Sequence, residues 1–198
     1  MSEALYTLAT AHQHSEDIKK SRFLAHAAPV QTSEQALAFV RQVSDLAATH
    51  NCWAYRIGQD YRFNDDGEPG GTAGRPILQA IEGQSIDRAV VVVTRWYGGI
   101  KLGAGGLVRA YGGTAAECLR LAERVPIVAM ARLGLRCDFA ELALLKARLR
   151  ELEAEVTRED FDADGVELDI RLPESRVDEA QARITDISRG RHNARRLD

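Results

Sequence analysis

The sequence contains little from which a disulfide framework or a membrane span could be built. It has only three cysteines among 198 residues, Cys52, Cys118 and Cys137, and no Cys-x-x-Cys pair. Their odd number and wide spacing predict reduced thiols and argue against a zinc ribbon. The longest aliphatic run, from Ala89 to Val93, has five residues. A transmembrane helix needs roughly 20 apolar residues, so none is predicted.

The N-terminus also lacks a basic segment that leads into an apolar stretch, so we expect no secretory signal and a cytoplasmic protein. Hydrophobic residues make up 45% of the chain and charged residues 28%, which is typical of a globular protein and argues against intrinsic disorder. With 26 basic and 29 acidic residues the net charge is −3. Before Pro126 there are 13 of each sign, and after it 13 basic and 16 acidic residues. The total charge therefore leaves room for a local basic surface in the first part.

The hydrophobic pattern restarts at Pro126 and predicts two small α+β domains of the α/β-sandwich type, residues 1–125 and 126–198. In the first, strand-like segments lie at 6–9, 23–30, 53–57, 61–63 and 89–93. Helical spacing follows Thr32 to about His50, and it recurs at 73–82 and over the apolar positions of 107–122. The continuous β-branched run at 89–93 predicts a strand that is covered on both faces.

The second part shows a β-α-β-β-α order. A strand pattern over 127–137 precedes a leucine stripe at 142–152, a weak strand near Val156, an Asp-Gly turn at 162–165, a strand at 166–172 and a helix from Val177 that stops at Gly190. This order predicts a ferredoxin-like domain.

Two glycine-rich segments, 64–71 and 98–106, are the most unusual features of the chain. Neither matches a known phosphate loop, because Ala104 and Gly105 stand where a P-loop needs Lys and Ser or Thr, and Val108 replaces the third glycine of a dinucleotide motif. The second segment lies between a strand and a helix. Free backbone N–H groups at the positive end of a helix dipole attract anions, and Lys101 lies inside this segment.

A purely structural role, without ligand binding, stays open for each of these residues. The glycines equally allow a helix to pack closely on a sheet. Asp65, Asp66 and Glu68 could hold a divalent ion, but such residues are favoured in turns, and no metal or cofactor site is predicted. His50 and Cys52 could form a nucleophile pair, although a buried cysteine is more often an apolar filler, and we assign no catalytic residue. The predicted nucleic-acid or anion-binding residues are Lys20, Arg22, Arg75, Arg95, Lys101, Gly103, Gly105, Gly106 and Arg109.

The segments Asp65–Pro76 and Val92–Tyr111 closely resemble the signature of the IMPACT/YigZ family. Lys20–Phe23 and His50–Tyr55 also match, so the resemblance spans most of residues 15–125, and the second domain resembles the C-terminal domain of bacterial members. The resemblance implies a first domain with the fold of a small-subunit ribosomal protein and of domain IV of elongation factor G, and a second domain similar to domain V of that factor. It also implies binding of nucleic acid or of the translation machinery. Eukaryotic members regulate a stress kinase that controls initiation.

The leading hypothesis is therefore a non-enzymatic, translation-associated regulator. It would bind RNA, the ribosome or a translation-factor partner through a basic glycine-rich surface of the first domain. One alternative is an enzyme that acts on a small phosphorylated metabolite, with Asp65, Asp66 or Glu68 as metal ligand or base. Another is a pure protein-interaction module anchored by Trp53, Trp96 or Tyr97. The sequence does not indicate an oligomeric state.

Overall fold

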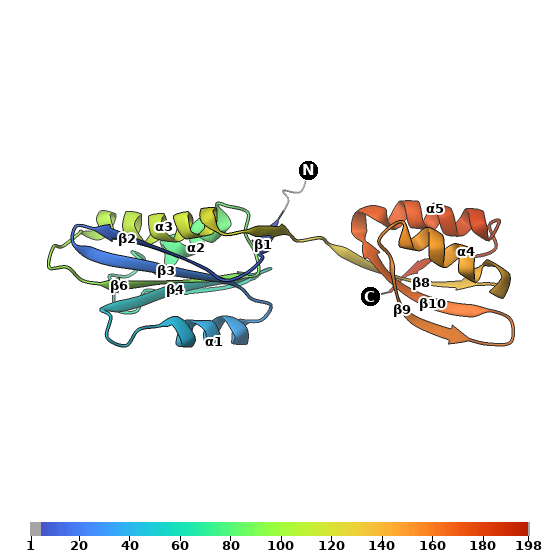
Figure 1. Ribbon diagram of the computed structural model, residues 1–198, viewed down its shortest axis with the longest axis horizontal. Coiled ribbons are helices and arrows are strands. Elements are labelled where there is room, and N and C mark those ends of the chain that lie inside the picture. The colour runs from blue at the N-terminus through green and yellow to red at the C-terminus, as the bar shows by residue number, and fades with distance from the viewer. Residues whose placement is uncertain (1–4, 198) are drawn as a thin grey trace. The chain divides into compact units, whose positions relative to one another are not determined.

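The structure is a computed structural model that describes residues 5–197, and it contains two compact units, Met1–Ile127 and Val128–Asp198 (Figure 1). Each unit has its own buried apolar core. Among the described residues, no helix is long and apolar enough to cross a membrane.

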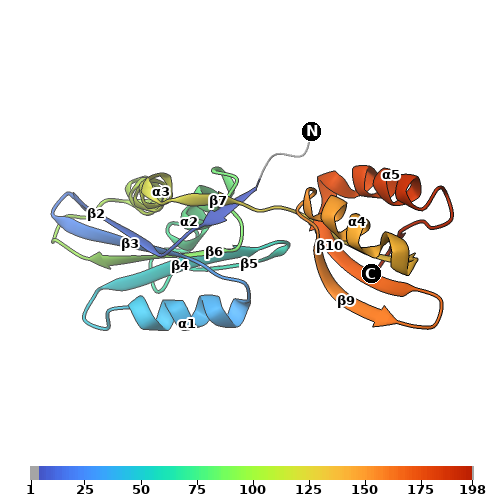
Figure 2. The ribbon, with the colours of Figure 1, turned by 45° about the vertical axis from the view of Figure 1, so that its right-hand side comes forward.

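The first unit is built on a five-stranded antiparallel sheet in the order β2-β3-β6-β4-β5. Its strands are β2 (His12–Ile18), β3 (Ser21–Pro29), β4 (His50–Ile57), β5 (Asp60–Asn64) and β6 (Ala89–Trp96). One face is covered by α1 (Ser33–Val43), and the other by α2 (Gly74–Glu82) and α3 (Ala104–Leu121), as Figures 1 and 2 show. A separate two-stranded sheet pairs β1 (Tyr6–Leu8) with β7 (Arg124–Pro126).

Strand β6 lies at the centre of these three layers. Val91 and Val93 pack in the cluster under α2 and α3, whereas Val90 and Val92 pack in the cluster under α1. All four side chains are fully buried, which confirms that both faces of this strand are covered. The predicted apolar face of the third helix is also buried as expected, at Leu107, Tyr111, Ala115, Cys118, Leu119 and Ala122.

Two expectations for this unit are wrong. Helix α1 ends at Val43 rather than near His50, because the Ser44 hydroxyl and N–H both donate to the Val40 carbonyl and the Asp45 carboxylate accepts from the Ala47 N–H. Side chains that bond to nearby backbone compete with a helix in this way. Strand β2 was not expected at all, since this edge strand contains a single aliphatic residue, Ile18.

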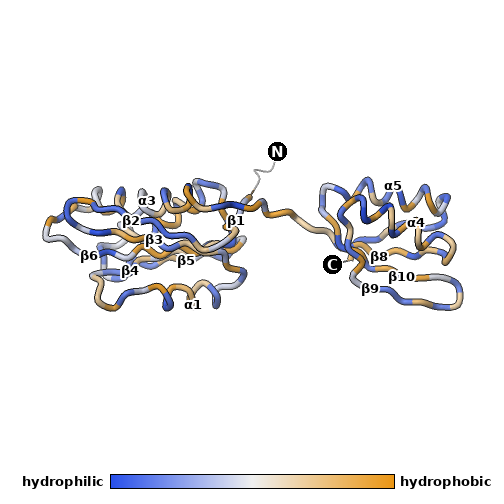
Figure 3. The backbone as a smooth tube through the Cα atoms, viewed as in Figure 1, coloured by the Kyte–Doolittle hydropathy of each residue, from blue (hydrophilic) through white to orange (hydrophobic). Residues whose placement is uncertain are grey.

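The second unit has a four-stranded antiparallel sheet in the order β11-β8-β10-β9. Its elements are β8 (Met130–Cys137), α4 (Phe139–Arg150), β9 (Glu155–Phe161), β10 (Val166–Pro173), the 3₁₀ turn η1 (Glu174–Arg176), α5 (Val177–Ile187) and β11 (Arg195–Arg196). The chain therefore follows the β-α-β-β-α-β order of ferredoxin-like domains. Most of the edge strand β9 is hydrophilic (Figure 3).

The first strand of this unit begins later than the pattern at 127–137 predicts. The Ile127 N–H donates to the Leu5 carbonyl, which keeps this residue in the first unit, and regular pairing starts only at Met130. The two-residue strand β11 was also unexpected, because a segment so short leaves no periodic signal.

Candidate functional site

The aspartates of the first glycine-rich loop hold the loop in shape. Both carboxylate oxygens of Asp65 accept hydrogen bonds of 2.8–3.0 Å from backbone N–H groups, those of Gly71, Ala73 and Gly74. The Asp66 carboxylate accepts from the Asn51 N–H at 2.6 Å. These carboxylates face backbone amides of their own fold, so the geometry favours the turn role over a divalent-ion site.

Glu68, from the same loop, forms a buried ion pair. Its Oε1 accepts from Arg95 Nη1 at 2.6 Å and from the Tyr111 hydroxyl at 2.7 Å. Only 4% of the Glu68 side chain and 6% of the Arg95 side chain are exposed. The guanidinium carbon of Arg95 lies 5.6 Å from the Phe23 ring centroid and 5.3 Å from that of Tyr97. Arg95 Nε is buried and has no hydrogen-bond partner among residues 5–197.

The imidazole of His50 lies beside this pair, because His50 on β4 is directly opposite Arg95 on β6. Its Nδ1 is 2.7 Å from the Asp66 carbonyl oxygen, which can only accept a hydrogen bond, so Nδ1 carries the proton. The other ring nitrogen, Nε2, faces Glu68 Oε2 at 3.7 Å. The His50 side chain is 21% exposed.

Cys52 points to the same face of the sheet but is fully buried. Its thiol donates to the Asp65 carbonyl at 3.0 Å. Burial strongly raises the pKa of this thiol, and the carboxylates of Glu68 and Asp66 add to the effect. Since the thiolate is the reactive form of cysteine, the structure favours a packing role for Cys52 over a nucleophile paired with His50.

A cavity of about 410 Å³ opens next to the Glu68–Arg95 pair, and we call it the Glu68 cavity. Its polar lining comes from this network and from the second glycine-rich segment, and includes His50, Glu68, Arg95, Lys101, Gly103 and Ala104. The volume lies within the range of about 300–1,000 Å³ that is typical of small-ligand pockets.

Helix α3 begins inside the second glycine-rich segment, at Ala104. The residue before it, Gly103, has φ +73°, a conformation that favours glycine. Among the described residues no side chain caps this helix, and its first turn contains no acidic residue. The N-terminus of α3 therefore presents its partial positive charge at the Glu68 cavity without a compensating side chain.

Two lysines join β2 to β3 in a strained turn. Lys19 and Lys20 have φ values of 46° and 65°, and the flanking Ile18 and Ser21 are paired in the sheet. Two positive φ values in a two-residue hairpin favour Asn-Gly, so each lysine costs on the order of 1 kcal/mol here. The turn touches the second glycine-rich segment, since a Cβ added to Gly98 would lie 1.8 Å from the Lys20 carbonyl oxygen.

A second cavity, of about 460 Å³, lies on the other side of Leu102 and is lined by Lys19, Gly106 and Arg109. The two carboxylates of its lining are engaged, Glu16 by the Thr114 hydroxyl and Glu117 by the Arg120 guanidinium. We call the four exposed cations of this end of the unit the basic cluster, which consists of Lys19, Lys20, Lys101 and Arg109. None of them forms an ion pair with another residue in the part of the chain that the structure describes.

The structure brings most of the predicted anion-binding residues to this end of the first unit. Those that line a cavity or lie between the two cavities are Arg95, Lys101, Gly103, Gly105, Gly106 and Arg109, and Lys20 belongs to the adjoining turn. Arg22 lies on the opposite face of the sheet, 5.2 Å from the Trp96 ring centroid. Arg75, in the first turn of α2, is exposed and lines neither cavity.

Lys19 belongs to a basic run with Lys20 and Arg22 that the sequence shows, but the predicted binding residues do not include it. Sequence reasoning missed the joining of Glu68, Arg95 and Tyr111. The positive φ of Lys19 leaves no mark in its residue type, and the three partners of the network come from segments that only the fold brings together. Trp53 is 9% exposed and belongs to the cluster under α1, so it cannot serve as an exposed interaction anchor.

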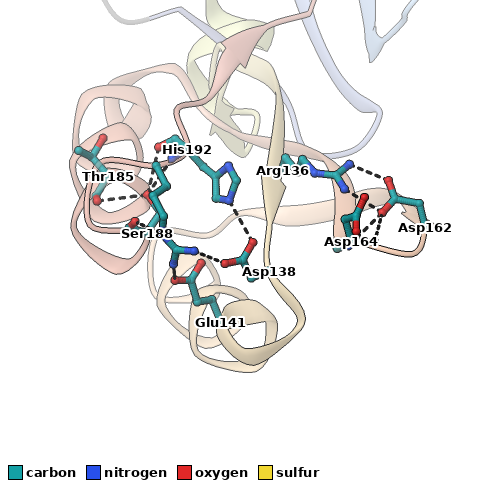
Figure 4. A network of polar contacts seen from close by, with 10 residues as sticks. Arg136, Asp138, Glu141, Asp162, Asp164, Thr185, Ser188 and His192 are labelled. Atoms are coloured by element: carbon teal, nitrogen blue, oxygen red, sulfur yellow. Dashed lines mark hydrogen bonds and ion pairs between the residues drawn. The ribbon is translucent and has the colours of Figure 1, made fainter.

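A separate polar network lies in the second unit (Figure 4). Asp138, Glu141 and His192 bring ligand atoms within 4.8 Å of one another, an arrangement that could hold a metal ion. However, the guanidinium of Arg191 donates to both carboxylates, and His192 Nε2 is 3.3 Å from Asp138 Oδ1. The network therefore ties the loop after α5 to the start of α4 without a metal.

Comparison with known proteins agrees with this architecture. The family models "Impact N-terminal domain" and "Domain of unknown function (DUF1949)" match residues 19–119 and 135–191. An IMPACT family member from Thermus thermophilus is 49% identical over 88% of this chain and 97% of its own, and YigZ from Escherichia coli K12 is 38% identical over 88% and 89%. YvyE from Bacillus subtilis is 35% identical over 96% and 90%.

A solved structure described as that of a hypothetical protein matches the fold with a TM-score of 0.72 and 35% identity, over 100% of this chain and 99% of its own. The mammalian proteins named Protein IMPACT, such as the human one at 37% identity, match over only 43% of this chain and 29% of their own length. The match to the Impact N-terminal domain, residues 19–119, includes both glycine-rich segments. By its two matched domains and its full-length relatives, this chain belongs to the IMPACT family.

Proposed function

We propose that this protein is a non-enzymatic, translation-associated regulator that binds RNA phosphates through the basic cluster and the start of α3. Membership of the IMPACT family implies a translation-related regulatory role. The proposed resemblance of the two units to domains IV and V of elongation factor G, a translation factor, fits this role.

The observation that carries the proposal is the uneven pairing of charges at this end of the first unit. Lys19, Lys20, Lys101 and Arg109 are exposed and have no carboxylate partner among residues 5–197. Of the neighbouring carboxylates, Glu117 is paired with Arg120, and Glu16 accepts a hydrogen bond from the Thr114 hydroxyl. Two of the lysines lie in a strained turn, and backbone strain of this kind is often found at binding sites. The first domain has 13 charges of each sign, and these four unpaired cations lie together at one end of it.

Fluorescence anisotropy with a single-stranded RNA tests this function. We expect binding near 50 mM salt with a logarithmic salt slope of about −0.7 for each phosphate neutralised. Lys101→Ala should weaken binding to all sequences alike and reduce the slope by about one contact. Arg41→Ala, on the exposed side of α1, is the matched control and should leave binding unchanged. Absent or salt-independent RNA binding would contradict the proposal.

The Glu68 cavity supports a second candidate, an enzyme that acts on a small phosphorylated metabolite. His50 Nε2 and Glu68 Oε2 lie 3.7 Å apart in a pocket of ligand size, so two groups that can carry protons line the same space. Turnover of phosphorylated metabolites that disappears in His50→Gln, while the protein stays folded, would favour this candidate. RNA binding that is unchanged in His50→Gln would favour the regulator.

A further inference from the structure

The Glu68 cavity has features of an anion site that the proposed RNA surface does not use. It lies at the N-terminus of α3, a helix of 18 residues whose first turn has no acidic residue and which no side chain of residues 5–197 caps. The partial positive charge of such a terminus favours anions, and its first backbone N–H groups point along the helix axis toward them.

Arg95 is an independent feature of the same cavity. Only 6% of its side chain is exposed. Its Nη1 donates to Glu68, whereas its Nε has no hydrogen-bond partner among residues 5–197. A buried N–H without an acceptor is unfavourable. Arg95 is one of the residues that line the cavity, so a ligand bound there would lie beside its guanidinium group.

The charges of the cavity also suit an anion. Glu68 is its only carboxylate within the described lining, and Arg95 and the Tyr111 hydroxyl already compensate this group. Lys101 adds an exposed positive charge. His50 also lines the cavity.

We propose that the Glu68 cavity binds a phosphate monoester, the group carried by a free nucleotide and by the 5′ end of an RNA strand. A monoester has a charge of about −1.5 to −2 at pH 7 and three terminal oxygens, so it can engage the helix N-terminus, Lys101 and Arg95 together. Tyr97, which is 44% exposed, supplies an aromatic wall for an attached ring. The RNA form of this ligand rests on the proposed function, whereas the nucleotide form does not.

Substitution of Ala104, the exposed first residue of α3, tests the site directly. Ala104→Glu places a carboxylate at the anion position, where it is also favourable for the helix, so the protein should unfold at the same or a higher temperature. Ala104→Gln is the matched neutral control. The probes are inorganic phosphate and AMP by calorimetry, and an RNA of about 12 nucleotides with a 5′ phosphate or a 5′ hydroxyl by anisotropy.

We expect AMP to bind the native protein, and the 5′-phosphorylated RNA to bind about tenfold more tightly than the 5′-hydroxyl RNA. Ala104→Glu should abolish both effects, and Ala104→Gln should keep them. Equal affinity for the two RNAs without AMP binding would overturn the cavity proposal and leave the proposed function standing. AMP binding without any RNA binding would support the cavity and refute the proposed function. Unaltered discrimination in Ala104→Glu would also overturn the cavity proposal.

Discussion

The Nη1 atom of Arg95 donates a 2.6 Å hydrogen bond to Oε1 of Glu68, and this single contact joins the end of β6 to the first glycine-rich loop. Both side chains are almost fully buried. The loop is thereby fixed against the sheet, and the two glycine-rich segments of the chain meet around one cavity.

Removal of one partner of this pair should strongly destabilise the first unit. Glu68→Ala leaves the Arg95 charge and the Tyr111 hydroxyl unpaired, which should cost about 3–5 kcal/mol of the free energy of unfolding. Glu82→Ala, which breaks a partly exposed pair with Arg56 at 3.8 Å, should cost less than about 1 kcal/mol. Urea denaturation measures the free energy of unfolding of both variants. A similar loss in the two would contradict the prediction that the buried pair contributes more than the exposed one.

Replacement of the two lysines of the strained turn should raise the stability of the protein and weaken its RNA binding. Lys19→Asn together with Lys20→Gly supplies the residues that two positive φ values favour, so we expect about 1 kcal/mol or more of added stability. The same change removes two cations of the basic cluster and should weaken RNA binding. Thermal unfolding and fluorescence anisotropy on one sample test both effects. A double variant that is less stable than the native protein would contradict the claim that the two lysines are strained.

Two glycines should respond to alanine in opposite directions. At Gly98 a Cβ would lie 1.8 Å from the Lys20 carbonyl oxygen, so Gly98→Ala must displace the backbone of the turn. At Gly113, inside α3, a Cβ meets nothing within 4 Å, and Gly113→Ala should stabilise the helix by about 0.5–1 kcal/mol. The prediction fails if the melting temperatures of the two variants move in the same direction.

The buried cysteines should be unreactive in the folded protein. Burial raises the pKa of Cys118 from its ordinary value of about 9 to about 12. Between these values the unfolded chain releases a proton that the folded one keeps, so stability falls as the pH rises through this window. Thiol titration with DTNB at pH 8 should detect none of the three cysteines before denaturation and all three after it. Rapid labelling of the native protein would contradict this packing.

A carboxylate of the second unit should titrate far below its usual range. The hydrogen bonds from Arg136, and then that from the Asp164 N–H, lower the pKa of Asp162 from 3.8 to about 2. Its contribution to stability is therefore present above about pH 4 and is lost as the pH falls toward 2. A carbonyl-detected NMR titration of Asp162 measures the value directly. It should rise toward 4 in Arg136→Gln and stay low in Arg132→Gln.

The elements that sequence reasoning found are those with a strong local pattern. The Val90–Val93 run and the apolar face of α3 are visible in the residue types alone, because periodicity and burial coincide there. Strand β2 was not predicted, because an edge strand can be polar and its hydrogen bonds to β3 leave no pattern in its own sequence. The same limit applies to the site. Lys101 was found inside its segment, whereas the buried contact of Glu68 with Arg95 depends on β4 and β6 being neighbours.

The pairing of β1 with β7 has a consequence for synthesis on the ribosome. Tyr6 pairs with Pro126, so the first strand of this unit to be synthesised pairs with the last one. The five-stranded sheet is encoded between these two strands and can form before β7 is available. The β1–β7 pair forms only after about residue 127 has left the ribosomal exit tunnel. During that interval β1 has the parallel bridge of Tyr6 to Ile86 but lacks its antiparallel partner β7, and such open edges attract other strands. Its brevity, three residues, limits this exposure.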